Sequence, residues 1–358
     1  MTTSTSMGGH RGLVWVDLLN SPNVLFVVPL LAELRGRGYG TVVTIRDFAQ
    51  TQALCELYGI RHLVIGEHGG AGLVGKATNL VRRAGNLVRF ARVVHPDYAL
   101  THNSYSQLIA TKALGIPSVT SMDYEYQPAN HLAFRCADWV FVPRAFPDTM
   151  LCRFGASTCR VWKFDGLKES ISLAGFRPRD DYLTLCGLRA DRVTVIVRPP
   201  AEFALYHRFT NDLFPHVLNR LAAEPSLQVI LLPRTPVQAA AFGRSEYADW
   251  VWQGEAFDGR ELVAAADAVI SAGGSMIREA ALLGVPAFSV YAGRLAAVDA
   301  GLVHDGRLQL LNSLSDIDAL VLQKNSRTRR AAVDDSLVSE FIDRCAAAWA
   351  TKEIRHSE

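Results

Sequence analysis

Ala268-Val-Ile-Ser-Ala-Gly-Gly-Ser-Met-Ile-Arg-Glu-Ala-Ala-Leu-Leu-Gly-Val-Pro-Ala-Phe-Ser-Val290 is the stretch that decides the fold, because it predicts a buried strand, a glycine turn, a helix and a second strand in succession. Gly273 and Gly274 carry no Cβ, so their backbone can approach a ligand closely. The helix predicted from Ser275 presents free N–H groups and a positive dipole end to this turn, which suits a phosphate. Glu279 follows about one turn later, where we expect a ribose attached to that phosphate.

The same alternation of strand and helix runs through the rest of the chain in two blocks. Predicted strands lie at 13–16, 41–45, 62–65, 98–101, 117–120 and 139–142 in the first block, and at 193–197, 227–232, 268–271 and 288–291 in the second. This alternation predicts an α/β fold with a parallel, doubly wound sheet in each block. Two Rossmann-like domains in series would bring the carboxyl ends of their strands to an interdomain cleft, where ligands bind.

The chain has 358 residues, which is enough for two domains of ordinary size. The boundary is expected where Gly, Pro and charged residues gather, as in a linker. We expect a disordered lead-in at 1–12, an N-terminal acceptor or catalytic domain at 13–164, a linker region at 165–192, a C-terminal nucleotide-binding domain at 193–335 and a C-terminal helix at 336–352. Apolar residues recur at helical spacing in that last helix, which could return to the first domain.

The composition indicates a globular protein and gives no reason to expect a nucleic-acid partner: 49% of the residues are hydrophobic, 20% are charged, and the net charge is +2. The six cysteines are far apart and include no Cys-x-x-Cys pair, which predicts reduced thiols in a cytoplasmic protein. No apolar run reaches the roughly 18 residues of a membrane span. The first residues lack the apolar segment of a secretion signal.

Polar side chains follow the predicted strands in both blocks, but they are of two kinds. Those of the first block are acids, amides and a histidine, which suit general acid–base chemistry. Those of the second block are arginines and glycines, which suit phosphates. This division predicts a nucleotide-bound donor on the second domain and an acceptor with its base on the first. The candidates are His102, Asp123 and Glu125 for catalysis, Asn20, Ser21, Asn103 and Tyr124 on the acceptor side, and Arg198, Arg234, Gly273, Gly274, Ser275, Arg278 and Glu279 for the nucleotide-sugar.

Several candidates also have a purely structural interpretation, and these interpretations stay open at this point. Asp123 and Glu125 could cap the following helix or pair with Arg135, and His102 could be a hydrogen-bonded structural histidine. Arg198 could form a surface salt bridge. Arg278 could point outward, and Glu279 could lie on the helix surface.

No metal site is predicted, and we expect the nucleotide-sugar as a substrate with no separate cofactor. Asp316-Ile-Asp318 spells a metal-binding Asp-x-Asp motif, but its position indicates the start of a helix capped by Ser315 or Asp316. No other group has the spacing of metal ligands. The Gly-x-Ser-x-Gly elbow of hydrolases and the P-loop pattern are both absent.

The segment 72–94 is basic and has apolar residues at helical spacing. One interpretation is a helix that packs its apolar stripe on the sheet and leaves its basic residues in water. The other is an amphipathic surface that contacts the inner face of a membrane and meets a lipid-linked acceptor. The basic residues are Lys76, Arg82, Arg83, Arg89 and Arg92.

The chain from about residue 13 to 350 resembles the GT-B-like family called domain of unknown function 354. The resemblance implies two Rossmann-like domains in a GT-B arrangement, and it implies no particular reaction. The stretches that carry it are WVDLLNSPNVLFVVPL (15–30), RDFAQT (46–51), DYEYQPAN (123–130), KFDGLKE (163–169), VRPPAEFALYH (197–207), LPRT (232–235) and SAGGSMIREAALLGVP (271–286).

Two better-understood GT-B groups are similar at a greater distance. The glycine turn and helix resemble those of the peptidoglycan lipid-linked N-acetylglucosaminyltransferase, which implies Glu279 on the ribose and the 273–275 backbone on the diphosphate. Arg198-Pro-Pro here replaces a glycine-rich turn of that group, so Arg198 is the expected substitute. The loops at 101–104 and 123–130 resemble those of non-hydrolysing UDP-N-acetylglucosamine 2-epimerases. Asn103 stands where those enzymes have an aspartate, and Gln127-Pro128 where they have two glutamates.

We therefore expect a metal-independent glycosyltransferase with a nucleotide-sugar donor, UDP-linked in the first instance. Asp123 is the preferred base because it closely follows a predicted strand. A nucleotide-sugar 2-epimerase is the first alternative, since Asp123 and Glu125 remain available to move protons. A non-catalytic nucleotide-sugar-binding protein is the second. The sugar, the acceptor and the oligomeric state stay open.

Overall fold

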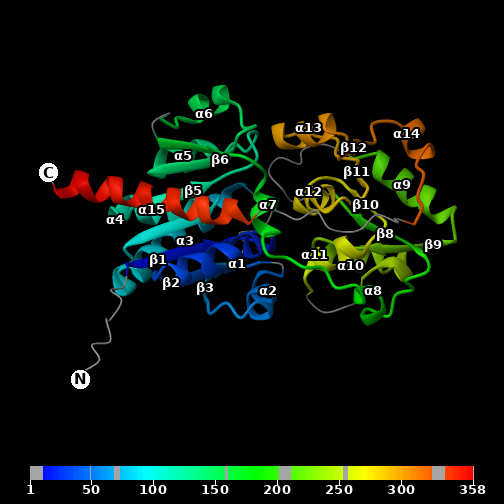
Figure 1. The fold of residues 1–358 in the computed structure, drawn as a ribbon, viewed down its shortest axis with the longest axis horizontal. Coiled ribbons are helices and arrows are strands. Elements are labelled where there is room, and N and C mark those ends of the chain that lie inside the picture. Colours follow the sequence, from blue (N-terminus) through cyan, green and yellow to red (C-terminus); the bar gives the residue numbers. More distant parts are fainter. Residues whose placement is uncertain are drawn as a thin grey trace, which may run out of the picture. The chain divides into compact units, whose positions relative to one another are not determined.

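The computed structural model describes residues 11–48, 50–67, 73–157, 160–200, 211–252, 257–324 and 335–357 (Figure 1). The chain forms two compact units, the first from Met1–Ser172 with Asp335–Glu358 and the second from Leu173–Asp334. The last helix therefore belongs to the first unit. Most of the predicted lead-in, residues 1–10, lies outside the described residues.

The first unit is built on a seven-stranded sheet in which every pairing is parallel. The strand order is β3-β2-β1-β4-β5-β6-β7. Strands β2 and β3 are thus added on one side of β1 and strands β4 to β7 on the other, so the order of addition reverses between β1 and β4. The strands are β1 (Leu13–Leu18), β2 (Gly40–Asp47), β3 (Leu63–Glu67), β4 (Tyr98–His102), β5 (Ser118–Ser121), β6 (Trp139–Pro143) and β7 (Val161–Phe164). Ligands of open parallel sheets bind beside the carboxyl ends of the strands at such a reversal.

Helices form two groups around this sheet. One contains α1, which contacts α2, α7 and α15, and the other runs from α3 through α4 and α5 to α6. Ser104 caps α4 by accepting a bond from the Gln107 N–H, and Gly115 ends that helix in the left-handed conformation. The helices are α1 (Ser21–Gly36), α2 (Thr51–Leu57), α3 (Leu73–Val94), α4 (Tyr105–Leu114), α5 (Asn130–Cys136), α6 (Asp148–Phe154), α7 (Lys168–Ser172) and α15 (Ser336–Ser357).

Helix α15 lies against other elements of the first unit (Figure 1). Aromatic packing and one arginine hold it there. Phe341 is fully buried and contacts the ring of Phe26 edge-on. The Trp349 ring stacks on Tyr98 with a centroid distance of 4.8 Å. Arg37 of the α1 end donates to the Ser339 carbonyl oxygen at 2.9 Å. Burial of such large rings is a main source of packing energy, so α15 is part of the core of this unit.

The second unit has a five-stranded parallel sheet of order β12-β11-β10-β8-β9. Its core consists of apolar side chains from β8, β9, β10 and α9, with Val195, Val197 and Ile270 fully buried. The strands are β8 (Val193–Arg198), β9 (Leu227–Leu231), β10 (Ala268–Ser271), β11 (Ala287–Ser289) and β12 (Gln309–Leu310). The helices are α8 (Tyr182–Leu185), α9 (Leu213–Ala222), α10 (Pro236–Phe242), α11 (Gly259–Ala265), α12 (Ser275–Leu282), α13 (Ala297–His304) and α14 (Leu314–Asp318), with a short 3-10 turn, η2, at Ala248–Trp250.

The predicted α/β class with two parallel sheets is confirmed. Two short strands were not predicted: β7, a four-residue edge strand that contains a lysine, and β12, which has two residues. The region 165–192 contains α7 and α8. The Asp-x-Asp motif lies in α14, where Ser313 is the cap and Asp316 completes a capping box.

Candidate functional site

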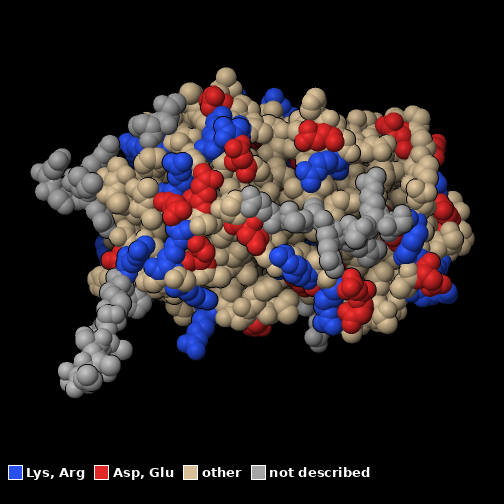
Figure 2. Space-filling view, in the orientation of Figure 1, with Lys and Arg blue, Asp and Glu red and all other residues tan. Residues whose placement is uncertain are grey.

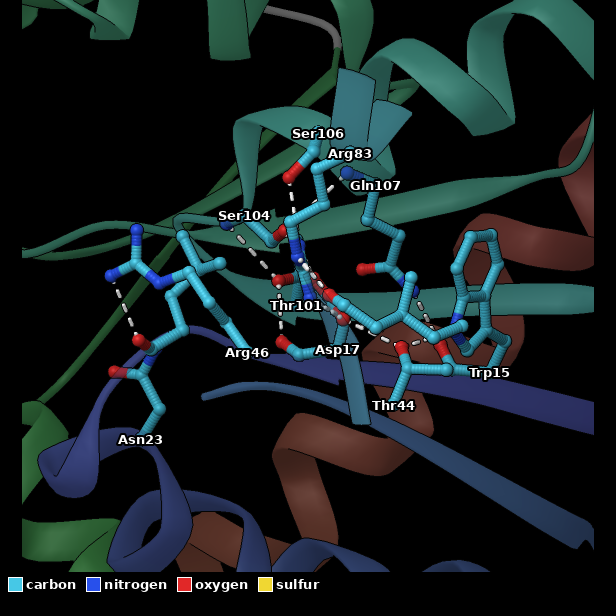
Figure 3. Close-up of polar contacts among 12 residues, drawn as sticks. Trp15, Asp17, Asn23, Thr44, Arg46, Arg83, Thr101, Ser104, Ser106 and Gln107 are labelled. Carbon is cyan, nitrogen blue, oxygen red and sulfur yellow. Dashed lines mark hydrogen bonds and ion pairs between the residues drawn. The ribbon is translucent and has the colours of Figure 1, made fainter. Parts of the chain in front are cut away.

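The carboxyl end of β1 carries a buried ion pair that supports the first candidate site (Figure 3). Asp17 is fully buried, and both of its oxygens accept bonds of 2.7 Å from Arg83 of α3. Thr44 of β2 and Ser104 after β4 donate to the same carboxylate. Asp17 thus joins two neighbouring strands, a helix and the loop that follows β4, and such a fully bonded network holds them rigidly.

The position of Arg83 differs from the one predicted for the basic residues of 72–94. This arginine was expected among the solvated basic residues of 72–94, but only 2% of its surface is exposed. Ala84, Leu87 and Ala91 pack in the core, whereas Arg82, Arg89 and Arg92 are exposed. The apolar stripe therefore packs within the unit, and membrane contact by the outer face stays a prediction. The Lys76 side chain lies outside the described part of the chain.

The loop after β4 is fixed by bonds to its backbone. The Thr101 hydroxyl donates to the Asp17 carbonyl oxygen at 3.1 Å and accepts from the Ser104 N–H at 3.2 Å. The Asn23 side chain of α1 donates to the His102 carbonyl oxygen at 3.0 Å. Asn103 has a φ of +67°, the left-handed conformation that asparagine tolerates. This backbone sets the direction of the His102 side chain.

His102 lies in a row of polar groups at the carboxyl ends of β4 and β5. Its Nδ1 is 2.7 Å from the Ser121 hydroxyl, and its Nε2 is 3.5 Å from Asp123 Oδ1. Lys168 Nζ, from α7, lies 3.3 Å from Asp123 Oδ2 and 3.4 Å from Glu169 Oε1. All five residues are buried. We call Ser121, His102, Asp123, Lys168 and Glu169 the acid–base cluster.

The electrostatics of this cluster favour a neutral imidazole. Burial lowers the pKa of His102 below its ordinary 6.5, and the nearby charge of Lys168 lowers it further. The hydrogen bond with Asp123 opposes this effect without reversing it. A neutral imidazole has one N–H, and the neighbouring carboxylate can only accept, so that hydrogen belongs on Nε2. Ser121 then donates to Nδ1.

The other candidates of the first unit follow β5 or β1. Glu125 is buried, with 1% of its surface exposed. The Tyr124 carbonyl oxygen accepts a bond from Asn130. Asn20 and Ser21 are at the start of α1, where the Ser21 hydroxyl accepts from the Gln50 N–H at 3.2 Å.

Arg135 and the start of α5, which the structural interpretations of the acidic loop involve, have the following contacts. Arg135 donates to the carbonyl oxygens of His131 and Phe154, and the cap position of α5 is Ala129.

Lys168 and Glu169 were not predicted as members of the site. They belong to the part of the KFDGLKE stretch, residues 165–169, that was assigned to the linker region. The signal that could have revealed them is the Asp165-Gly166 turn, which indicates that a strand ends just before it. Because β7 was not predicted, the sequence did not indicate that this turn follows a strand at the same end of the sheet as the other candidates.

The second candidate site is the glycine turn between β10 and α12. Gly273 and Gly274 have φ values of +91° and +107°, in the region that favours glycine. The Ser271 hydroxyl donates to the Gly273 carbonyl oxygen at 2.9 Å. The α12 helix has Gly274 at its cap position, and this residue has no side chain with which to cap it. Its first N–H groups therefore face the turn, as in anion-binding helix ends.

Two arginines from neighbouring strand ends approach this turn. Arg234 follows β9 and donates from Nε to the Pro199 carbonyl oxygen at 2.6 Å and from Nη2 to the Gly273 carbonyl oxygen at 2.7 Å. Arg198 ends β8 and donates to the Leu232 carbonyl oxygen at 3.1 Å. Burial lowers the pKa of Arg198 to about 9, with a further contribution from Arg234, while Glu279 opposes the shift. Positive charge is thus concentrated here, which favours an anion.

Glu279 and Arg278 are both buried, so neither has the surface position that its structural interpretation gave it. Glu279 is 4% exposed and close enough to Arg198 to affect its charge, so neither residue forms only a surface contact. Arg278 is bonded to Asp299 of α13, with Nε 2.6 Å from Oδ1. Arg278 therefore joins α12 to α13, and its predicted phosphate contact stays a prediction. The rest of the VRPPAEFALYH stretch, residues 201–207, lies outside the described residues.

The chain belongs to the family described as "Protein of unknown function (DUF354)", whose model matches residues 13–348. A curated relative is the uncharacterized protein MJ0665 of Methanocaldococcus jannaschii. It is 28% identical over 310 residues, which cover 85% of this chain and 89% of that protein. The family resemblance found in the sequence is confirmed.

Solved structures with this fold include epimerases and a glycosyltransferase. The UDP-N-acetylglucosamine 2-epimerase from Rickettsia bellii matches with a TM-score of 0.69 and 17% identity over 95% of this chain and 97% of that one. The Methanocaldococcus jannaschii UDP-GlcNAc 2-epimerase, in complex with UDP-GlcNAc and UDP, gives 0.66 and 10% over 93% and 99%. The glycotransferase of kitacinnamycin gives 0.54 and 14% over 97% and 98%. These matches confirm the predicted GT-B fold.

Two properties of the described residues bear on partners. Within that part of the chain, no group of three or more His, Cys, Asp or Glu side chains is placed to hold a metal ion. None of the helices described is both long and apolar enough to cross a membrane. Figure 2 shows basic and acidic side chains interspersed over the face in view, in keeping with the net charge of +2.

Proposed function

We propose that this member of the DUF354 family is a metal-independent glycosyltransferase that uses a nucleotide-sugar donor, with UDP as the first nucleotide to test. The observation that carries the proposal is the convergence of Arg198, Arg234 and the start of α12, which has a glycine at its cap position, on the Gly273-Gly274 turn. Backbone N–H groups and two guanidinium groups together suit a diphosphate. Glu279, in the first turns of the same helix, is the proposed partner of the ribose hydroxyls.

The names of similar proteins support the same class of ligand. The Methanocaldococcus jannaschii epimerase was solved with UDP-GlcNAc and UDP, and the kitacinnamycin protein is named a glycotransferase. Both share the fold of this chain at low sequence identity. We carry over only the ligand class, a nucleotide-sugar, and leave the sugar open.

The acid–base cluster supports transfer to an acceptor hydroxyl. The two oxygens of Asp123 lie near His102 and Lys168, so the carboxylate has a fixed orientation. In the proposed reaction Asp123 removes the proton of the acceptor hydroxyl as its oxygen attacks the anomeric carbon. The bond from that carbon to the nucleoside diphosphate breaks, and Arg198, Arg234 and the α12 N-terminus stabilise the departing diphosphate in place of a metal ion.

A nucleotide-sugar 2-epimerase is the second candidate, and one observation favours it. Glu169 adds a buried carboxylate to Asp123 and Glu125, which partly replaces those that the sequence lacks relative to the epimerases. Elimination and re-addition of the nucleotide require protons to move at carbon, for which several such groups would serve. A protein that binds the nucleotide-sugar without converting it is the third.

Nucleotide binding is the first test. Thermal-shift and calorimetric titrations would compare UDP, UDP-sugars and the other nucleoside diphosphates, with and without a chelator. We expect UDP to stabilise the wild type equally in both conditions and to lose affinity in Glu279→Ala. Glu224→Ala is the matched control, because Glu224 pairs with Arg220 on α9. The proposal fails if no nucleotide stabilises the wild type, or if Glu279→Ala binds as tightly as the control.

Isotope labelling then separates the reactions. With a UDP-sugar in deuterated water, a 2-epimerase places deuterium on C2 of the sugar, whereas a transferase leaves C2 unlabelled and releases UDP only when an acceptor is present. Asp123→Asn is expected to stop either reaction and to keep UDP affinity, since the nucleotide is assigned to the second unit. Binding without either product would identify the third candidate.

A further inference from the structure

Helix α7 contributes two members of the acid–base cluster, Lys168 and Glu169. It begins directly after the turn that ends β7, where Gly166 has a φ of +113° and the Leu167 N–H donates to the Ser170 hydroxyl. A Cβ at Gly166 would lie 3.2 Å from that hydroxyl, so the turn requires glycine. The start of α7, and with it Lys168, is therefore fixed in place.

The Lys168 side chain is only 8% exposed, which is unusual for lysine. Its Nζ lies between two carboxylates, at 3.3 Å from Asp123 and 3.4 Å from Glu169. A buried ammonium group remains charged when opposite charges compensate for its lost hydration. The two carboxylates provide that compensation, so Lys168 is placed as a positive charge beside the proposed base.

We propose that Lys168 is a positioning residue that keeps Asp123 as a carboxylate and keeps His102 as a neutral imidazole with its hydrogen on Nε2. This inference rests on the proposed function only in calling Asp123 the base. A proton on Asp123 or a second proton on His102 would place additional positive charge beside the ammonium group, and both are therefore disfavoured.

Among the described residues, the charged groups that act on His102 are Asp123, Lys168 and Glu169. The hydroxyl of Ser121 and the ring of Phe26 from α1, whose centroid is 5.3 Å away, also lie beside it. Burial and Lys168 lower the pKa of His102, while Asp123 and Glu169 raise it. Removal of the lysine charge leaves two negative groups beside the ring, so protonation becomes easier.

Nitrogen NMR of the full chain with isotopically labelled histidine tests this inference without any ligand. The His102 signals are assigned by their absence in His102→Asn. In the wild type near neutral pH we expect a protonated Nε2 and an unprotonated Nδ1. In Lys168→Gln we expect the pKa of His102 to rise by about one unit or more. Lys168→Arg retains the charge and should retain the low pKa.

Lys163→Gln is the matched control, because Lys163 lies in the same segment but bonds to Asp148 and to the Phe146 carbonyl oxygen. It should leave the His102 signals unchanged. The inference is overturned by a doubly protonated ring or an Nδ1–H tautomer in the wild type, or by equal pKa values in Lys168→Gln and the control. If Lys168→Gln does not fold, the wild-type tautomer and the Lys168→Arg titration decide. UDP titration of the same samples tests the proposed function separately, since the two results can differ.

Discussion

Arg234 donates a hydrogen bond of 2.7 Å to the carbonyl oxygen of Gly273 and thereby joins the loop after β9 to the turn after β10. The same guanidinium group bonds to the Pro199 carbonyl oxygen after β8. One side chain thus connects three strand ends of the second unit. It also brings positive charge to the start of α12. Its role can therefore be tested both by the stability of the turn and by the affinity for an anion.

Replacement of Arg234 by Gln should weaken nucleotide binding. The variant loses a positive charge beside the diphosphate and the bond that holds the Gly273 carbonyl. We expect the Kd for UDP to rise at least tenfold, which corresponds to about 1.4 kcal/mol. Calorimetric titration measures this change. Arg189→Gln is the control, because Arg189 is exposed and pairs with Asp191. An unchanged Kd in Arg234→Gln would remove this arginine from the site.

Gly274→Ala should damage the turn itself. Gly274 has a φ of +107° and a ψ of −179°, a conformation that is strained for any residue with a Cβ. We expect a loss of about 1–3 kcal/mol in the free energy of unfolding and a loss of UDP binding. Gly301→Ala is the matched control. Gly301 lies in α13, and nothing is within 4 Å of an added Cβ there.

The Gly301→Ala control should be neutral or gain about 0.5–1 kcal/mol, because alanine favours a helix. Urea unfolding compares the two variants, and equal stabilities would contradict the strained conformation of Gly274.

The pair of Asp17 and Arg83 should make a large contribution to the stability of the first unit. Asp17→Asn leaves a buried guanidinium group without its counter-charge, so we expect a loss of about 3–5 kcal/mol in urea unfolding. Simultaneous replacement by Asp17→Leu and Arg83→Met removes both charges and should recover part of that loss. Asp165→Asn is the control, because its pair with Arg144 is exposed and should contribute little. A double variant as unstable as Asp17→Asn would argue against this explanation.

The two candidate sites differ in how much of each the sequence predicts. The turn from Gly273 to Glu279 is local, since strand, glycines and helix start follow one another within a few residues. Its position and its glycine conformations could therefore be predicted. Arg198 and Arg234 were also predicted, because each ends a clear apolar run. The contact of Arg198 with the loop after β9 and that of Arg234 with the loop after β8 could not be predicted, because both depend on the strand order of the sheet.

Long-range pairing explains what was missed. Arg83 pairs with Asp17 across 66 residues of sequence, and nothing in a basic helical segment indicates which arginine turns inward. Lys168 reaches the cluster because β7 lies at the edge of the sheet. The run Val-Trp-Lys-Phe is too short and too polar to show this by pattern. Of the acid–base cluster, His102 and Asp123 were thus predicted, whereas Ser121 and the two α7 members, Lys168 and Glu169, were not.

Stability at mildly acidic pH should depend on His102. Its pKa is lowered in the folded protein from the ordinary 6.5, chiefly by burial. Below pH 6.5 the unfolded chain gains a proton at this residue before the folded chain does. The contribution of a neutral His102 is therefore complete above 6.5 and is lost as the pH falls through the folded pKa, with a slope of up to about 1.4 kcal/mol per pH unit.

The His102→Gln variant cannot titrate at this position, so its stability should fall less steeply than that of the wild type below pH 6.5. Urea unfolding at a series of pH values measures both slopes. His216→Gln, on the exposed side of α9, is the control and should keep the wild-type slope. Parallel curves for wild type and His102→Gln would mean that His102 takes up its proton equally in both states, and the neutral imidazole assigned to the acid–base cluster would then be wrong.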